Sequence, residues 1–262
     1  MIIVLNFGSQ FAHLIARRVR DMGVRAEILP HDATPADIRA FNPAGIILSG
    51  GPSSVLEKGS PKPHADIFTL GIPILGICYG HQAIAHMLGG KVTPGKHREF
   101  GKEMLLVSKR SGLFKGLAPK EIVWFSHGDQ AAKLPKGFSA IASTDSCTYA
   151  AFENEKQRIY GIQFHPEVTH TKHGKTVLKN FVTDICKAKK DWNMKTVAHD
   201  IIERVKEEVG KEEVVVGISG GVDSLVAATL IHKAIGNRLH AVFVDTGLLR
   251  KGEVEQVGGF LR

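Results

Sequence analysis

The segment from Ile72 to Gln82 constrains the fold most, because an apolar run meets a helical pattern there at one cysteine. Ile72–Ile77 predicts a buried strand, and Tyr79–Leu88 predicts a helix. Cys78 stands at the junction, between Gly76 and Gly80. So abrupt a strand-to-helix turn is crowded, and glycine removes the Cβ atoms that would clash. The pattern predicts a nucleophile elbow with Cys in place of Ser.

The elbow also predicts a reactive thiol. It places the sulfur at a helix N-terminus, whose partial positive charge favours the thiolate. The alternative is a buried cysteine that packs as a small apolar side chain. The chain has only three cysteines, Cys78, Cys147 and Cys186, without the spacing of a disulfide framework. An odd, sparse set is typical of a reducing compartment.

The N-terminal apolar run Ile2–Leu5 is too short for a signal peptide or a membrane span. We therefore expect a cytoplasmic protein without a membrane partner. The formal net charge of +8 and the pI of about 9.4 suggest an anionic ligand. Basic residues are scattered apart from Lys187, Lys189 and Lys190, and no RNA-binding aromatic motif accompanies them. Nucleotides are favoured over nucleic acid.

Strand and helix patterns alternate at short spacing before the elbow. This alternation predicts an α/β fold, a mostly parallel open sheet with helices on both faces. The predicted strands are 1–5, 24–29, 45–48, 72–77, 91–93, 101–107, 122–125, 139–143, 148–153 and 158–164, and the predicted helices are 11–21, 35–40, 79–88 and 174–186. Residues 126–129 are expected to form a polar exit from a strand.

An imidazole and a carboxylate follow the strand Arg158–Phe164 as His165 and Glu167. Residues two apart in extended chain face the same side, so both side chains can point toward Cys78. The Cys78 thiolate can then attack an acyl carbon while His165 transfers the proton and Glu167 orients the imidazole. The alternative for His165 is a purely structural histidine. A hydrolase of the α/β-hydrolase kind is disfavoured, because its acid precedes its histidine.

A glycine-rich turn, Ser49–Ser53, ends the strand Gly45–Leu48 at the edge where Cys78 is expected. Its glycines can expose backbone N–H groups to a ligand. We expect the N–H groups of Gly51 and Tyr79 to form an oxyanion hole. The alternative is a plain turn before Pro52.

A polar connector at 187–195 marks the boundary between an expected first domain, 1–189, and an incomplete second α/β unit, 190–262. The second unit has a predicted helix at 196–209 and two apolar strands, Glu213–Ile218 and Leu239–Val244. Between these strands, Gly217–Ser224 is a glycine-rich loop before a helix. Such a loop cradles anions, but it lacks the Gly-Lys-Ser/Thr of a Walker A loop.

The motifs Gly76–Gln82 and Phe164–Glu167 resemble the class I, triad-type glutamine amidotransferases. The resemblance covers residues 1 to 186. It implies a flavodoxin-like domain that hydrolyses L-glutamine through a thioester, without a cofactor or metal in that step. It also implies that glutamine is bound by Gln82, Ser126, His127, Gly128 and Asp129.

The loop Ser219–Ser224 resembles the PP-loop of ATP pyrophosphatases, and the alternative is an ordinary strand–helix turn. The resemblance implies that the pyrophosphate of ATP is bound by Ser219, Gly220, Gly221, Val222, Asp223, Ser224 and Leu225.

Both motifs in this order resemble the GMP synthase family, as do Phe7–Gln10, Leu14–Val19 and Val244–Lys251. Asn6 and Phe100 depart from the family pattern, which usually has Asp and Tyr there. The resemblance implies ATP and Mg²⁺ in the full enzyme, with XMP adenylated and then aminated by ammonia to GMP. It also implies a homodimer, formed through a C-terminal region that this sequence lacks.

The second unit has fewer strands than a PP-loop domain needs, and the tail Gly258–Arg262 leaves the family pattern. We therefore expect a truncated form that retains the glutaminase half-reaction and not GMP synthesis. We also expect its apolar strands to be exposed and prone to aggregation. The alternatives are an idle binding or regulatory fragment, a glutaminase module for another PP-loop synthetase, and a tRNA-modifying PP-loop protein.

Overall fold

The computed structural model describes residues 1–245, 247, 249–250 and 252–260. Its contacts divide the chain into two compact units, Met1–Asp191 and Trp192–Arg262. This division falls two residues after the boundary expected at 189. Thr246, Leu248 and Lys251 of the motif Val244–Lys251, and residues 261–262 of the tail, lie outside the described residues.

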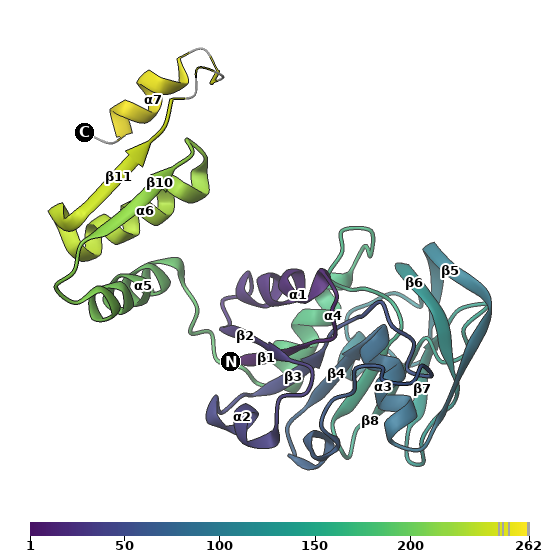
Figure 1. The fold of residues 1–262 in the computed structure, drawn as a ribbon. Coiled ribbons are helices and arrows are strands. Elements are labelled where there is room, and N and C mark those ends of the chain that lie inside the picture. Colours follow the sequence, from purple (N-terminus) through teal and green to yellow (C-terminus); the bar gives the residue numbers. More distant parts are fainter. Residues whose placement is uncertain (246, 248, 251, 261–262) are drawn as a thin grey trace. The chain divides into compact units, whose positions relative to one another are not determined.

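The first unit is built on a nine-stranded sheet in the order β2-β1-β3-β4-β9-β8-β7-β5-β6 (Figure 1). The first five strands of that order are parallel. They are β2 (Ala26–Pro30), β1 (Ile2–Asn6), β3 (Gly45–Leu48), β4 (Ile74–Ile77) and β9 (Ile159–Ile162). The chain leaves β1 for β2 on one side and continues to β3 on the other. Ligands gather at the carboxyl ends of parallel strands beside such a reversal.

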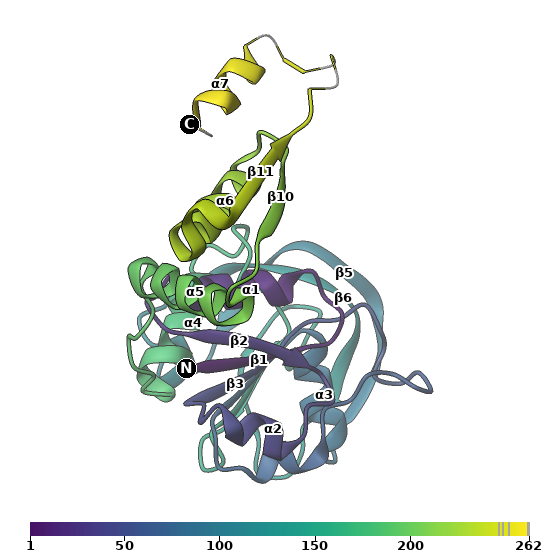
Figure 2. The same cartoon turned by 60° about the vertical axis from the view of Figure 1, so that its left-hand side comes forward.

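Helices cover both faces of the parallel strands, as the sequence predicts, and the α/β fold is confirmed. On one face, α1 (Phe11–Arg20) and α4 (Gly174–Lys179) pack into one apolar core. On the other face, α2 (Pro35–Ala40) and α3 (Tyr79–Met87) contribute to a second core. Figure 2 shows α1 and α2 on opposite sides of β1. Residues Ile2–Leu5 of β1 are all apolar because alternate residues enter the two cores.

The other four strands extend the sheet by antiparallel pairing. They are β8 (Ala151–Asn154), β7 (Ser139–Ser143), β5 (Lys91–Val107) and β6 (Lys120–Lys133). Two expectations were wrong here. Residues 91–107 form one long strand instead of two short ones. Residues 126–129 lie inside β6, because its pairing with β5 continues past Phe125, so they are not an exit from a strand.

Smaller differences concern the helices of the first unit. The helix expected over 174–186 is α-helical only to Lys179, and Asn180–Ile185 continues it as a π-helix. Short 3-10 helices at Ala65–Thr69 and Gly112–Phe114 were not predicted. At the N-terminus of α2, the capping box of Thr34 and Asp37 satisfies helix amides that would otherwise lack a partner.

The second unit holds a two-stranded parallel sheet, β10 (Val214–Ile218) and β11 (Leu239–Phe243). Its helices are α5 (Met194–Val209), α6 (Val222–Ile235) and α7 (Glu253–Phe260), with a 3-10 turn at Gly236–Arg238. Its small core contains Ile218, Ala228 and Val257. In the described part of the chain, every helix is too short or too polar to cross a membrane.

Candidate active site

The backbone at Cys78 has the strained geometry that an elbow requires. Its φ of 53° and ψ of −103° are rare for a residue with a side chain. A Cβ added to Gly76 would lie 2.5 Å from the backbone of Gly80, and one added to Gly80 would lie 2.5 Å from the carbonyl oxygen of Leu48. Both glycines are therefore needed for the close approach of strand and helix. The turn places the Cys78 sulfur at the carboxyl end of β4 and at the N-terminus of α3.

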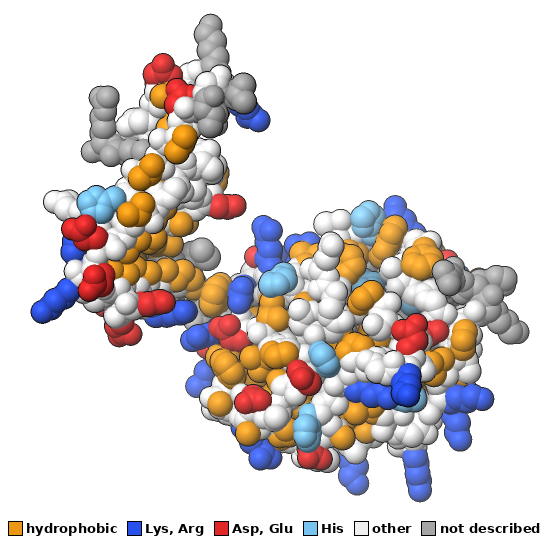
Figure 3. Space-filling model, in the orientation of Figure 1, with side chains coloured by type: hydrophobic (Ala, Val, Ile, Leu, Met, Phe, Trp, Pro, Cys, Tyr) orange, Lys and Arg blue, Asp and Glu red, His pale blue; other side chains and the backbone are white. Residues whose placement is uncertain are grey.

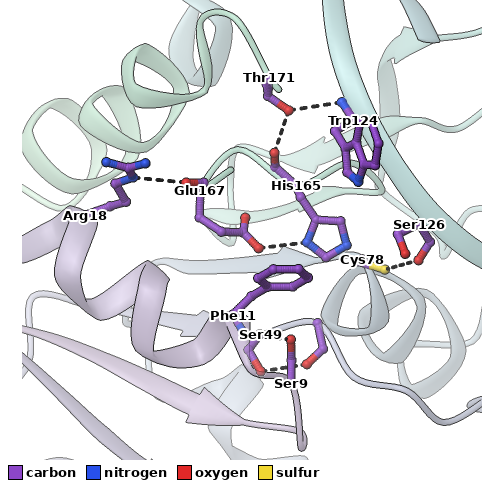
Figure 4. Close-up of polar contacts among 11 residues, drawn as sticks. Ser9, Phe11, Arg18, Ser49, Cys78, Trp124, Ser126, His165, Glu167 and Thr171 are labelled. Atoms are coloured by element: carbon purple, nitrogen blue, oxygen red, sulfur yellow. Dashed lines mark hydrogen bonds and ion pairs between the residues drawn. The ribbon is translucent and has the colours of Figure 1, made fainter. Parts of the chain in front are cut away.

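His165 and Glu167 come together behind this sulfur. The His165 Nδ1 atom lies 2.7 Å from the Glu167 Oε1 atom, and both side chains are buried. Figure 4 shows the imidazole between the carboxylate and Cys78. Burial opposes protonation of His165, but the charge and hydrogen bonding of Cys78, and then of Glu167, outweigh it and raise its pKa to about 10. The arrangement favours a protonated imidazole beside Cys78.

Four contacts hold the loop that carries this pair. The Thr171 hydroxyl donates to the carbonyl of His165 at 2.6 Å and accepts from the N–H of Trp124 at 3.0 Å. The Arg18 Nε atom on α1 donates to the carbonyl of Glu167 at 3.0 Å (Figure 4). The ring of Phe11, also on α1, lies 5.2 Å from the imidazole. Helix α1 and strand β6 thus fix the loop from two sides.

The glycine turn after β3 closes the site from another side. A Cβ on Gly50 would lie 3.1 Å from the imidazole of His165 and 3.7 Å from the Cβ of Cys78. A Cβ on Gly51 would lie 2.6 Å from the carbonyl oxygen of Phe7. The Ser49 hydroxyl accepts from the N–H of Phe7 at 3.1 Å, which ties the turn to the end of β1. Only glycine allows the backbone to approach this closely.

A pocket of about 660 Å³ opens over Cys78. Of the residues predicted for this site, it is lined by Cys78, His165, Gly51, Tyr79, Gln82, Ser126, His127, Gly128 and Asp129. Glu167 is fully buried behind His165 and does not line the pocket. The structure therefore brings the whole predicted glutaminase set to one place, although its members come from four separate parts of the sequence.

The residues predicted to bind glutamine are joined by hydrogen bonds. The Gln82 side-chain nitrogen donates to the carbonyl of Asp129 at 2.7 Å. The His127 Nδ1 atom lies 2.9 Å from the same oxygen, and burial lowers the His127 pKa to about 4. The Cys78 sulfur lies 3.6 Å from the carbonyl of Ser126.

Sequence reasoning missed several residues of the pocket. Ser54 and Glu57 lie on the loop after the glycine turn and line the pocket, and the Ser54 hydroxyl donates to the Asp129 carboxylate. Phe100 stands at the pocket with 66% of its surface exposed. The segment Gly8–Phe11 also lines it. The sequence signal that could have placed Ser54 and Glu57 at the pocket is their short distance along the chain from Gly51.

The glycine-rich loop of the second unit is organised around two serines. The Ser224 hydroxyl accepts from the N–H of Ser219 at 3.2 Å and donates to the carbonyl of Gly221 at 3.0 Å. Gly220 has a φ of 78°, and α6 starts at Val222 without a side-chain cap. The first amides of α6 thus lack a side-chain cap, and amides at a helix N-terminus can bind an anion. Among the described residues, no group of His, Cys, Asp and Glu could hold a metal ion.

Residues 3–185 match the model of the family described as glutamine amidotransferase class-I. The chain belongs to the class I glutamine amidotransferase family. A second match covers residues 194–256 and is to the family described as NAD synthase. The class I amidotransferase domain is thus followed by the start of a PP-loop domain.

Relatives of this amidotransferase include the glutamine-hydrolysing GMP synthases of Vibrio vulnificus and Vibrio cholerae, which are 52% and 51% identical over 256 residues. The match covers 98% of this chain and 50% of each relative, so the chain spans about half of their length. A crystal structure from Thermoplasma acidophilum, described as that of a GMP synthase subunit, is 34% identical, with a TM-score of 0.62. The match covers 71% of this chain and 93% of the Thermoplasma chain.

A glutamine amidotransferase structure from Thermotoga maritima matches with a TM-score of 0.52 at 18% identity. The match covers 89% of this chain and 96% of the Thermotoga chain. At this identity the likeness concerns the fold alone.

Proposed function

We propose that this chain hydrolyses L-glutamine to glutamate and ammonia with Cys78 as nucleophile, His165 as acid and base, and Glu167 as the group that orients His165. The observation that carries the proposal is the buried His165–Glu167 pair beside a cysteine held in an elbow. The family makes an amide the expected substrate. The pocket has polar groups for the polar ends of glutamine, among them Gln82 and Asp129.

The chemistry follows from this arrangement. The Cys78 thiolate attacks the side-chain amide carbon, and the N–H groups of Gly51 and Tyr79 stabilise the oxyanion. His165 gives its proton to the amide nitrogen as the carbon–nitrogen bond breaks, and ammonia leaves a thioester. Water then attacks the thioester while His165 takes its proton, and the carbon–sulfur bond breaks. Glutamate leaves, and the thiolate and imidazolium are restored.

Two measurements test the glutaminase. We expect a glutamine-like electrophile, such as a diazoketone analogue of glutamine, to label Cys78 stoichiometrically, because Cys78 lines the pocket and Cys147 and Cys186 do not. We expect Cys78→Ala to abolish both labelling and glutamate release, and Cys147→Ser to keep both. Labelling elsewhere, or glutamate release by Cys78→Ala, contradicts the proposal.

We further propose that the complete protein is a GMP synthase in the cytoplasm, of which this chain is the glutaminase and the start of the synthetase. The carrying observation is the likeness to GMP synthases across both units. Residues Ser219–Leu225 would hold the pyrophosphate of ATP, which with Mg²⁺ would supply activation of XMP for attack by ammonia. We expect this chain alone not to form GMP from XMP, ATP and glutamine, and GMP formation by it contradicts that expectation.

A second candidate is an idle glutamine-binding module. Its support is that the chain matches only half of each relative, so a partner portion could be required for turnover. Glutamate release with and without the remaining synthetase portion distinguishes the two. Release by this chain alone supports an active glutaminase, and release only after addition of that portion supports the idle module.

A further inference from the structure

Two buried residues beneath the pocket, His81 and Gln163, have no role in the chemistry above. His81 is on α3 beside Gln82, and Gln163 follows β9 two residues before His165. Both are fully buried. They connect to the pocket through the Gln82 side chain, whose nitrogen donates to the carbonyl of Asp129 at 2.7 Å and to the Gln163 oxygen at 3.4 Å.

The donors and acceptors of this network can be assigned from its His81 end. The His81 Nε2 atom lies 2.9 Å from the carbonyl oxygen of Tyr149. A carbonyl only accepts, so Nε2 carries the hydrogen. Burial lowers the pKa of His81 to about 3, so the ring is neutral and Nδ1 is an acceptor.

Gln163 joins this acceptor to Gln82. The Gln163 side chain is within electrostatic reach of the His81 imidazole. The Gln163 oxygen already accepts from Gln82, so its nitrogen is the group left for His81 Nδ1. That nitrogen and Nδ1 are both buried and have no hydrogen-bond partner among the described residues, so each is the group that the other lacks.

The His81 ring is closely packed. It lies against the Phe152 ring, with centroids 4.4 Å apart and planes tilted by 33°. A Cβ on Gly161 would lie 3.0 Å from the His81 Cδ2 atom and 2.4 Å from the Phe152 ring, so glycine leaves room for both rings there.

We propose that His81 and Gln163 are positioning residues that hold the Gln82 carboxamide with both N–H groups toward the protein and its oxygen toward the pocket. Gln82 then offers the ligand an acceptor, which suits an N–H donor of glutamine. The inference rests on the proposed glutamine site. We call the contacts from His81 through Gln163 to Gln82 the relay. Without the relay, the Gln82 carboxamide can turn and present its N–H groups to the pocket, where they repel an N–H donor of glutamine.

The test measures glutamine binding without turnover, as protection of Cys78 in the full chain against alkylation by iodoacetamide. We expect Gln163→Leu to weaken protection about tenfold or more, because the Gln82 nitrogen loses one of its two acceptors. We expect Gln163→Glu to stay within about threefold of the natural chain, because a carboxylate still accepts from Gln82 while His81 becomes the donor. Alkylation without glutamine should be unchanged in both.

The matched control is Asn180→Leu. Asn180 is another buried amide, with hydrogen bonds to the carbonyls of Leu113 and Lys115, and it does not line the pocket. We expect it to lose stability and keep protection. Equal weakening in Asn180→Leu and Gln163→Leu overturns the relay, as does full protection of Gln163→Leu or weakening of Gln163→Glu to the level of Gln163→Leu.

A direct measurement is the tautomer of His81 in ¹⁵N NMR spectra of the imidazole groups. We expect the proton on Nε2, and a proton on Nδ1 overturns the relay. If glutamine does not protect the natural chain at all, the proposed function fails. A natural chain that is protected, with Gln163→Leu protected equally, overturns the relay alone.

Discussion

At the scale of single residues, Cys78 and His165 depend on each other. The imidazole is buried, which by itself disfavours its charged form. The negative charge of Cys78 and the Glu167 carboxylate reverse this effect. The second Glu167 oxygen is buried without a described hydrogen-bond partner, so the His165 imidazolium is the main compensation for this carboxylate. The three groups thus form one electrostatic unit.

The first prediction concerns Cys78→Ala, which removes the negative partner of His165. We expect the pKa of His165 to fall well below the value of about 10 that the natural chain has, because burial then acts with only Glu167 opposing it. NMR titration of the His165 ring checks this. The matched variant Cys147→Ser removes a cysteine in the apolar core and should leave the titration unchanged. An unaltered His165 pKa in Cys78→Ala contradicts the coupling.

The second prediction concerns acid, which should destabilise the first unit through two buried histidines. Burial lowers the pKa of His81 to about 3 and of His127 to about 4, while an unfolded chain keeps the ordinary value of 6.5. The unfolded state therefore binds protons first. The contribution of these neutral histidines to the free energy of unfolding is complete above pH 6.5. It falls as the pH drops toward 4, by about 1.4 kcal/mol per pH unit for each histidine.

Urea unfolding between pH 7 and pH 4.5 measures this dependence. His81→Asn should reduce the slope of the free energy of unfolding against pH by about the contribution of one histidine. The control is His13→Asn, at an exposed position on α1, which should keep the slope of the natural chain. A slope that is the same in all three chains contradicts the assignment.

At the scale of elements, the site depends on how closely β4 and α3 approach β3. Gly76 and Gly80 face each other across the elbow, and Gly80 also contacts the backbone of Leu48. The nearest atoms at both glycines belong to the backbone of another element, which cannot rotate away. The strained Cys78 backbone persists because these elements hold it from both sides.

The third prediction is that Gly80→Ala lowers the free energy of unfolding of the first unit by about 1–3 kcal/mol, because the new methyl group meets backbone at 2.5 Å. It should also slow labelling of Cys78 by a glutamine-like electrophile. Gly217→Ala is the control, since no atom lies within 4 Å of its added Cβ. Chemical denaturation and labelling rates check both, and an unaffected Gly80→Ala chain contradicts the packing argument.

At the scale of the whole molecule, the two units differ in how well they cover their sheets. The first unit buries its parallel strands between two cores. In the second unit, Val215 and Val242 on β10 and β11 are 71% and 46% exposed, and Val244 is 65% exposed. Figure 3 shows hydrophobic side chains gathered on this unit. Their exposure agrees with the expectation from the apolar sequence.

The fourth prediction follows from this difference. A chain of residues 1–191 should fold with labelling of Cys78 intact, because its contacts are internal to the first unit. It should also associate less than the full chain, because the exposed apolar strands are gone. Light scattering and labelling check both. In the full chain, Val215→Thr should reduce association more than Val254→Thr on α7, and equal effects contradict the assignment to the sheet face.

The sequence by itself determined the elbow and the Cys78, His165 and Glu167 set as candidates. These features are local. The spacing of glycines indicates where two backbone segments approach closely, and alternation along a strand indicates which side chains share a face. The same reasoning identified the glycine-rich loop of the second unit and most of the α/β elements before it.

Only the tertiary structure decided which strands pair beyond β9, and hence that residues 126–129 lie within β6. It also decided that Ser54 and Glu57 reach the pocket and that His81 and Gln163 stand behind Gln82. These relations join residues that are far apart in the chain. No local periodicity encodes them, because they depend on which faces of distant elements meet when the two cores are packed.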